Sequence, residues 1–281
     1  MADLLNIACL QTRPMPTFEA ALGEALPLAT RAVEEGANLL SLPEYCGGLV
    51  SDGPRLVPPR AAEAAHLVLT ELRGFASTHG VWIQIGSIAV EGPQGKIWNR
   101  GYLVGPQGQI AGRYDKIHLF DIQLSEQEVY RESDSVAPGT EAVLHDMAGV
   151  GLGHTICYDL RFPQLYRDLA QAGAQILTCP AAFTQKTGEA HWHVLNRARA
   201  IENGAFMVSA CAHGAIPGGG AAYGHSLIID PWGKVLADGG EGAGVISAKI
   251  DLAQVAETRA RIPSLQHDRA FSLVTDERDI A

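Results

Sequence analysis

Short apolar runs alternate along the chain with longer stretches in which apolar residues recur every three or four positions. The short runs predict buried strands at residues 4–10, 38–42, 81–85, 150–156, 174–179, 205–210, 226–230 and 244–250. The longer stretches predict helices at residues 18–35, 61–79, 162–171 and 190–203. Two further runs, 97–104 and 109–114, flank the turn Gly105-Pro106-Gln107-Gly108 and predict a hairpin.

Strands and helices therefore alternate from one end of the chain to the other, which predicts an α/β fold. Of the 281 residues, 47% are hydrophobic and 19% charged, a composition that can bury a large core and excludes a disordered chain. No repeat, linker or abrupt change of composition divides the sequence, so we expect a single domain over residues 1–281. The periodicity allows either one mixed sheet or two stacked sheets.

The charge balance and the cysteines narrow the class of protein. The chain has 21 Lys and Arg against 31 Asp and Glu, a net charge of −10, which argues against a nucleic-acid partner. The chain has no run of about 18 apolar residues, so we expect no membrane span. The first residues, MADLLNIACLQTRP, do not resemble a secretory signal. Five scattered cysteines do not form a disulfide framework, so we expect a cytoplasmic protein with free thiols.

Cys157 is the first candidate for chemistry. It lies in the string GHTICYDLRFP, where an apolar strand ends and a turn leads into the helix that starts near Pro163. Backbone N–H groups at such a turn can favour a thiolate and can also bind an oxyanion. The alternative, a buried structural cysteine, remains open on this context alone.

Three charged residues offer the groups that a thiol nucleophile needs. Glu44 follows a predicted strand in LPEY and can act as a general base, while Lys116 in YDKIHLFD can stabilise an oxyanion. Glu132 in RESD offers a second carboxylate. Taken alone, each of them is better explained as an ordinary solvated side chain.

Taken together, these motifs resemble the nitrilase superfamily of carbon–nitrogen hydrolases. The matching strings are LPEY, YDKIHLFD, ESDSVAPG, GHTICYDLRFPQLYRDLAQAGAQIL, PAAFTQKTGEAHW, NRARAIENGAF, YGHSLIIDPWG and VISAKIDL, which cover nearly the whole chain. The resemblance implies a four-layer α-β-β-α sandwich and a homodimer, or an assembly of dimers, joined through helices beside the active site. It also implies hydrolysis of a small-molecule amide with no cofactor.

The resemblance assigns roles to the candidate residues. It implies that Cys157 is the nucleophile, Glu44 the general base and acid, and Lys116 the oxyanion stabiliser. Glu132 matches an additional glutamate that positions Lys116 and the substrate. We infer that the backbone N–H of Tyr158 shares the oxyanion with Lys116.

The strings AHW, RARAIE and YGHSLIIDPWG are most similar to the Nit subgroup, whose members hydrolyse deaminated glutathione or the ω-amides of 2-oxo acids. Arg161 and Phe183 are candidate substrate contacts, and a structural ion pair is the alternative for Arg161. His193 stands where the subgroup has Glu, and the loops 121–130 and 215–222 also differ, which leaves the substrate open. Cleavage of N-carbamoyl compounds is the alternative reaction, and a catalytically silent binding module is the alternative to an enzyme.

Three other motifs point to competing chemistry and are interpreted as structural. His191 and His193 could bind one metal ion on a strand, where alternate residues share a face. The pattern predicts a helix here, in which residues two positions apart do not face each other, so we expect no metal. The string Gly224-His225-Ser226 lacks the second glycine of a serine-hydrolase elbow. The glycines at 218–220 lack the lysine and helix of a phosphate loop and predict a mobile loop.

Overall fold

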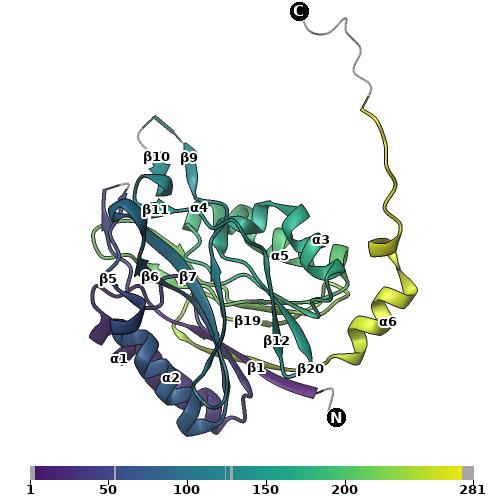
Figure 1. Cartoon of the computed structure of the whole chain (residues 1–281), viewed down its shortest axis with the longest axis horizontal. Helices are drawn as coiled ribbons and strands as arrows, with labels where there is room; N and C mark the ends of the chain where they lie inside the picture. Colours follow the sequence, from purple (N-terminus) through teal and green to yellow (C-terminus); the bar gives the residue numbers. More distant parts are fainter. Residues whose placement is uncertain (1–3, 54, 124, 127–128, 274–281) are drawn as a thin grey trace, which may run out of the picture.

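Two β-sheets lie face to face with helices on both outer faces (Figure 1). The structure is a computed structural model that describes residues 4–53, 55–123, 125–126 and 129–273. Side chains from both sheets meet between them: Ile7 and Leu39 from the first, Ile176 and Phe206 from the second, all of them buried. The fold is therefore the α-β-β-α sandwich that the resemblance implied, which resolves the choice between one sheet and two.

The first sheet contains the N-terminal strands and closes with the last strand of the chain. Its order is β11 (Val136–Ala137), β7 (Ile97–Val104), β6 (Trp82–Glu91), β2 (Leu39–Ser41), β1 (Leu4–Gln11) and β20 (Gly244–Asp251), with β5 (Arg60–Ala61) beside β6 and β8 (Ile110–Asp115) beside β7. The strands β1, β2 and β6 are parallel. Strand β7 runs antiparallel to β6 and β8 and parallel to β11, and β20 runs antiparallel to β1.

The second sheet repeats this plan in the C-terminal half. Its order is β12 (Val143–Met147), β13 (Val150–His154), β14 (Ile176–Thr178), β15 (Phe206–Ser209), β18 (Leu227–Ile229) and β19 (Val235–Asp238). The strands β13, β14 and β15 are parallel and the outer pairings are antiparallel. The short hairpins are β3–β4 (Ser51–Asp52, Arg55–Leu56), β9–β10 (Asp121–Gln123, Val129–Arg131) and β16–β17 (His213–Ala215, Ala221–Tyr223).

Helices cover the outer faces of the two sheets. The helices α1 (Phe18–Glu34) and α2 (Leu67–His79) pack on the first sheet, and α3 (Pro163–Gln171) and α5 (His193–Asn203) on the second. The remaining helices are α4 (Gln185–Thr187), α6 (Ala253–Arg261), a π-helical turn at Gly188–Trp192, and short 3₁₀ turns at Glu63–Ala65, Pro93–Gly95, Glu132–Asp134, Cys157–Arg161 and Ser264–Gln266. Within the described residues, no helix is both long and apolar enough to cross a bilayer.

The first helix shows how the local sequence specifies an element. The Thr17 side chain accepts a hydrogen bond from the N–H of Ala20 and so caps the helix N-terminus. Buried residues at Ala21, Ala25, Ala29 and Ala32 place small side chains on one face. That face packs onto the first sheet, as the spacing of apolar residues predicts.

Two predicted helices begin later than the sequence suggested. The helix expected from residue 61 begins at Leu67, because Arg60–Ala61 pairs with β6 and Glu63 forms ion pairs with Arg100 and Arg113. The helix expected from residue 190 has α-helical geometry only from His193, after the π-helical turn.

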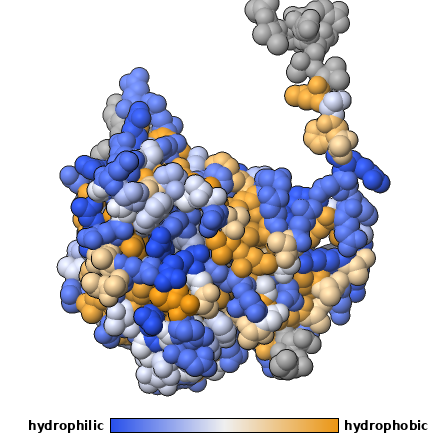
Figure 2. Space-filling view, in the orientation of Figure 1, coloured by the Kyte–Doolittle hydropathy of each residue, from blue (hydrophilic) through white to orange (hydrophobic). Residues whose placement is uncertain are grey.

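Asp268 forms an ion pair with Arg167 on α3, and the segment 269–273 that follows extends away from the sandwich (Figure 1). Its apolar residues Phe271 and Leu273 are 90% and 84% exposed, and Figure 2 shows apolar atoms along this segment. This segment therefore adds nothing to the core of the chain.

Candidate active site

Four loops bring the predicted charged residues and the thiol together at one edge of the two sheets. Glu44 follows β2, Lys116 follows β8, Glu132 opens the 3₁₀ turn after β10, and Cys157 opens the turn after β13. Ligands of α/β proteins gather at the carboxyl ends of parallel strands, where β2 and β13 end. All four side chains are at most 7% exposed.

Lys116 lies between two carboxylates. Its Nζ is 2.8 Å from Oε1 of Glu44 and 2.8 Å from Oε2 of Glu132. Burial alone would lower the pKa of Lys116, but the charges of Glu132 and Glu44 hold it well above its ordinary value. Lys116 is therefore a fixed ammonium ion at neutral pH, as oxyanion stabilisation requires.

Cys157 occupies a strained position in the backbone. Its φ is +49°, which is uncommon for a residue other than glycine and is found most often at functional sites. Its N–H donates to the carbonyl of Pro180, and its thiol interacts with the carboxylate of Glu44. This turn directs the sulfur toward the carboxylate that can take its proton.

The pKa shifts of the pair show how the thiol is held before reaction. Burial and then the charge of Glu44 raise the pKa of Cys157 well above its ordinary value, against the opposing effect of Lys116. Burial also acts to raise the pKa of Glu44, but Lys116 and the N–H of Ala182 outweigh it and lower the pKa. The resting pair is therefore a neutral thiol beside a carboxylate, and a thiolate forms only when Glu44 takes the proton.

Asn99 and Tyr45 complete the polar network and were missed by the sequence analysis. The amide of Asn99 donates to Glu44 at 2.9 Å and to Glu132 at 3.1 Å, and the hydroxyl of Tyr45 donates to Glu132. Asn99 is fully buried on β7, and a polar residue at an inward-facing position of an apolar strand was the available signal.

Asp159 was also missed, although it belongs to the motif around Cys157. Its carboxylate accepts hydrogen bonds from the N–H groups of Ile156 and His118 and from the hydroxyl of Tyr114. Asp159 is fully buried. It therefore ties the turn that carries Cys157 to the segment that carries Lys116.

A cavity of about 500 Å³ opens above these groups. The four predicted residues lie in its wall, together with Phe183, Lys186, Tyr130 and the glycines at 218–220. The glycine segment, expected to be a mobile loop, packs against Ser51: a Cβ at Gly218 would lie 1.8 Å from the Ser51 carbonyl oxygen. Of the loop 121–130, residues 124, 127 and 128 lie outside the described part of the chain.

The secondary site residues differ in their positions. Phe183 lines the cavity, and its ring lies 5.7 Å from the guanidinium of Arg161. Arg161 also lies over the ring of Tyr158 and hydrogen-bonds with His191 at 3.2 Å. Neither Arg161 nor Tyr158 is part of the cavity wall in this structure.

The two histidines of the segment AHWH, residues 190–193, have different partners. His191 contacts Arg161, whereas His193 turns toward Asp238 with 2.9 Å between Nε2 and the carboxylate. They do not share a ligand position, as expected for a helical segment.

A model of the carbon–nitrogen hydrolase family matches residues 6–260. The chain belongs to this family. It is 39% identical to the deaminated glutathione amidase of Synechocystis sp. (strain PCC 6803 / GT-S), covering 92% of this chain and 96% of that protein. It is 35% identical to the omega-amidase NIT2 of Mus musculus, covering 94% and 95% of the two chains.

Solved structures agree with the family assignment. The NitFhit protein of C. elegans superimposes with a TM-score of 0.87 at 32% identity, over 96% of this chain and 66% of that one. The predicted family, its Nit-type subgroup and the fold are therefore confirmed, and the chain is a carbon–nitrogen hydrolase of the amidase type.

Proposed function

We propose that the chain hydrolyses the terminal amide of a small carboxylate-bearing molecule through a Cys157 thioester. The observation that carries the proposal is the buried arrangement in which Lys116 lies between Glu44 and Glu132 while Glu44 also interacts with the Cys157 thiol. These groups supply a nucleophile, a base and a fixed positive charge at the wall of one cavity.

In the first half-reaction the sulfur of Cys157 attacks the amide carbon while Glu44 takes the thiol proton. The carbonyl oxygen becomes an oxyanion, which the Lys116 ammonium and the Tyr158 N–H stabilise. Glu44 then gives its proton to the departing nitrogen as the C–N bond breaks, and ammonia leaves behind a thioester.

In the second half-reaction water hydrolyses the thioester. Glu44, again a carboxylate, takes a proton from the water as its oxygen attacks the thioester carbon. The C–S bond breaks, the sulfur recovers the proton from Glu44, and the carboxylic acid product leaves. Glu132 positions Lys116 through both of its oxygens in both half-reactions.

A lysine in the cavity wall offers a contact for a substrate carboxylate. Lys186 lines the cavity, and it is a cation outside the Glu44–Lys116–Glu132 cluster. We assign it to the substrate carboxylate, while Arg161, which lies outside the cavity wall with its guanidinium 5.7 Å from the ring of Phe183, adds positive charge nearby. Deaminated glutathione, named by the activity of one relative, carries such carboxylates, as do the ω-amides of 2-oxo acids, which the resemblance to the Nit subgroup implies.

A substrate panel tests the reaction class. Purified protein is assayed for ammonia release from deaminated glutathione, a 2-oxo acid ω-amide, a neutral amide, an N-carbamoyl amino acid and a nitrile. We expect release from the carboxylate-bearing amides and none in the Cys157→Ala variant, with the buried Cys46 changed to Ala as the control. Release only from the N-carbamoyl compound would replace the proposed substrate class, and release by Cys157→Ala would overturn the thioester.

We also propose that the protein forms a homodimer through α5. Val194 and Ile201 on α5 are 68% and 51% exposed, and Trp232 in the neighbouring turn is 58% exposed, so apolar side chains gather on one surface. We expect Ile201→Glu to produce monomers in light scattering, whereas Val57→Glu, at an exposed apolar residue elsewhere, leaves the dimer intact. A wild-type monomer would refute this interface.

We propose a cytoplasmic location. All five cysteines are buried free thiols, which suits a reducing compartment. Secretion with retained activity in an oxidising medium would argue against it.

A further inference from the structure

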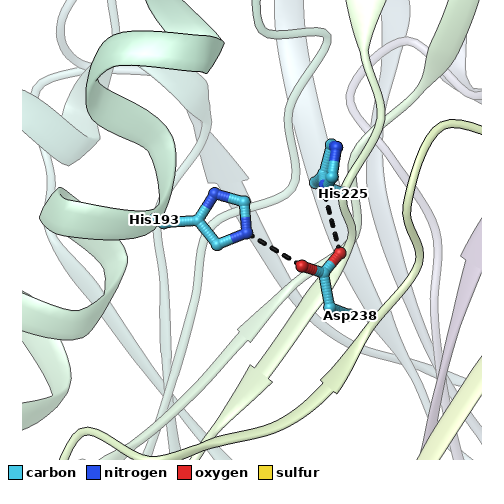
Figure 3. A group of neighbouring side chains, drawn as sticks. All are labelled: His193, His225 and Asp238. Carbon is cyan, nitrogen blue, oxygen red and sulfur yellow. Dashed lines mark hydrogen bonds and ion pairs between the residues drawn. The ribbon is translucent and has the colours of Figure 1, made fainter.

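Three side chains from distant parts of the chain converge outside the catalytic cavity. His193 opens α5, His225 lies between β17 and β18, and Asp238 ends β19; Figure 3 shows them pointing toward one another. The carboxylate of Asp238 bridges the two rings, 2.9 Å from Nε2 of His193 and 2.9 Å from Nδ1 of His225. One ligand atom from each residue lies within 4.8 Å of the other two.

We propose that His193, His225 and Asp238 form a binding site for a divalent transition-metal ion, with zinc the best match. Two imidazoles and one carboxylate are ligands that Zn²⁺ prefers, and three protein ligands leave a fourth position for water. The side chains are 20–35% exposed, so an ion can reach them from solvent.

The observed spacing is close to that of a bound site. Zinc binds these ligands at about 2.0–2.2 Å, so ligand atoms around a tetrahedral ion lie about 3.3 Å apart. Each of the three ligand atoms therefore needs to move toward the other two by about 1 Å or less. Each imidazole would exchange its hydrogen bond to Asp238 for a bond to the ion. Side-chain rotation on an exposed surface supplies a movement of this size.

The surroundings hold two of the ligands in place. The N–H of Gly240 donates to Oδ1 of Asp238 at 2.9 Å, and the ring of Tyr223 stacks on His225 with 4.6 Å between ring centroids. The φ of His225 is +52°, a strained conformation that fixes where its side chain points. Ligands held by other contacts in this way are typical of metal sites.

An ion at this position would link elements that form the cavity wall. Trp192 precedes His193, donates its indole N–H to the carbonyl of His225 at 2.7 Å, and packs against Phe183 with 5.0 Å between ring centroids. Phe183 lines the catalytic cavity, but His193, His225 and Asp238 do not. The proposed ion is therefore structural or regulatory and takes no part in amide cleavage.

The sequence analysis expected no metal, because it compared only His191 with His193. The real partners are separated by 32 residues between His193 and His225 and by 13 between His225 and Asp238, spacings that no short motif reveals. Only the folded chain places them together.

Calorimetric titration of the untagged protein with Zn²⁺ tests the site. The Cys157→Ala background removes the reactive thiol as a competing ligand. We expect one saturable site whose affinity falls at least tenfold in each of the variants His193→Ala, His225→Ala and Asp238→Asn. The control His79→Ala, at an exposed histidine on α2, keeps the original affinity.

A second reading separates loss of ligands from loss of fold. Tetrahedral Co²⁺ gives visible absorption bands that report the ligand set, so we expect these bands in the parent and in His79→Ala but in none of the three site variants. Circular dichroism without metal checks that the variants fold. The proposal is overturned if the parent shows no saturable Zn²⁺ binding, or if all variants bind with the affinity of the parent, which would leave the cluster as a hydrogen-bonded bridge.

Discussion

The substitution Glu132→Gln removes one negative charge from the network around Lys116 while keeping the shape of the side chain. Both oxygens of Glu132 accept hydrogen bonds: Oε1 from Asn99 and Lys116 at 3.1 Å each, and Oε2 from Lys116 at 2.8 Å and from the N–H of Phe120 at 2.6 Å. Glutamine has only one accepting oxygen. Its NH₂ group must therefore face a donor, whichever way the amide is turned.

The cost follows from these contacts. Loss of a hydrogen bond between charged groups costs about 1.5–3 kcal/mol, and a buried donor left unpaired costs a further 1–3 kcal/mol or so. Part of this cost appears as a lower free energy of unfolding. The other part appears as weaker stabilisation of the oxyanion, because Lys116 is displaced from it. With about 3 kcal/mol lost from the transition state, kcat/KM falls by about a hundredfold.

Steady-state kinetics with an active amide, combined with thermal unfolding, measures both parts. We expect most of the loss in kcat, because Lys116 acts on the oxyanion and not on the bound amide. The control Glu189→Gln changes an exposed glutamate and should alter kcat/KM less than twofold. If Glu132→Gln keeps kcat within threefold of the parent, the argument that Glu132 positions Lys116 is wrong.

Three further predictions follow from the same geometry. Glu44 has a lowered pKa and Lys116 a raised one, so kcat/KM should fall only below pH 4.5, where Glu44 becomes protonated, and above pH 10.5, where Lys116 loses its proton if alkaline unfolding does not intervene. A value of kcat/KM that still rises with pH above 4.5 would contradict this. Lys186→Met should raise KM about tenfold for carboxylate-bearing amides and leave KM for a neutral amide unchanged, and an equal effect on both would refute its role. Gly86→Ala places a Cβ 2.1 Å from the backbone carbonyl two residues before Glu44, so we expect a loss of about 1–3 kcal/mol in the free energy of unfolding together with lower activity. Gly74→Ala, in open space on α2, should instead raise stability by about 0.5–1 kcal/mol, and the same thermal unfolding measurement compares the two.

The long elements were predictable from the sequence because the helices show a clear apolar period and the longer strands contain continuous apolar runs. The helix α1 and the strands β1 and β7 show buried positions where the apolar pattern predicted them. The short strands β12 and β19 at the sheet edges and the helix α6 were missed. Only Val255 of α6 is buried, so the sequence of that helix carries little periodic signal.

The motifs predicted the four central site residues because each lies in a short string that ends an element. The network around them was harder to predict, since Asn99 and Asp159 act through contacts with residues 33–55 positions away. The partnership of His193 with Asp238 depends on how the helix and the sheet edge pack. Such contacts follow from the fold and leave no pattern along the chain.

The central claim is that amide cleavage passes through a covalent intermediate on Cys157, with Glu44 moving the proton in each step. Rapid acid quench of the wild-type protein during turnover of an amide that it hydrolyses, followed by intact-mass spectrometry, tests it directly. We predict an added mass equal to the acyl group less one hydrogen, mapped by peptide analysis to Cys157. The adduct should be absent in both Cys157→Ala and Glu44→Gln, because Glu44 must take the thiol proton before the thioester can form. Complete turnover by Glu44→Gln at the rate of the parent, or an adduct on another residue, would contradict the account.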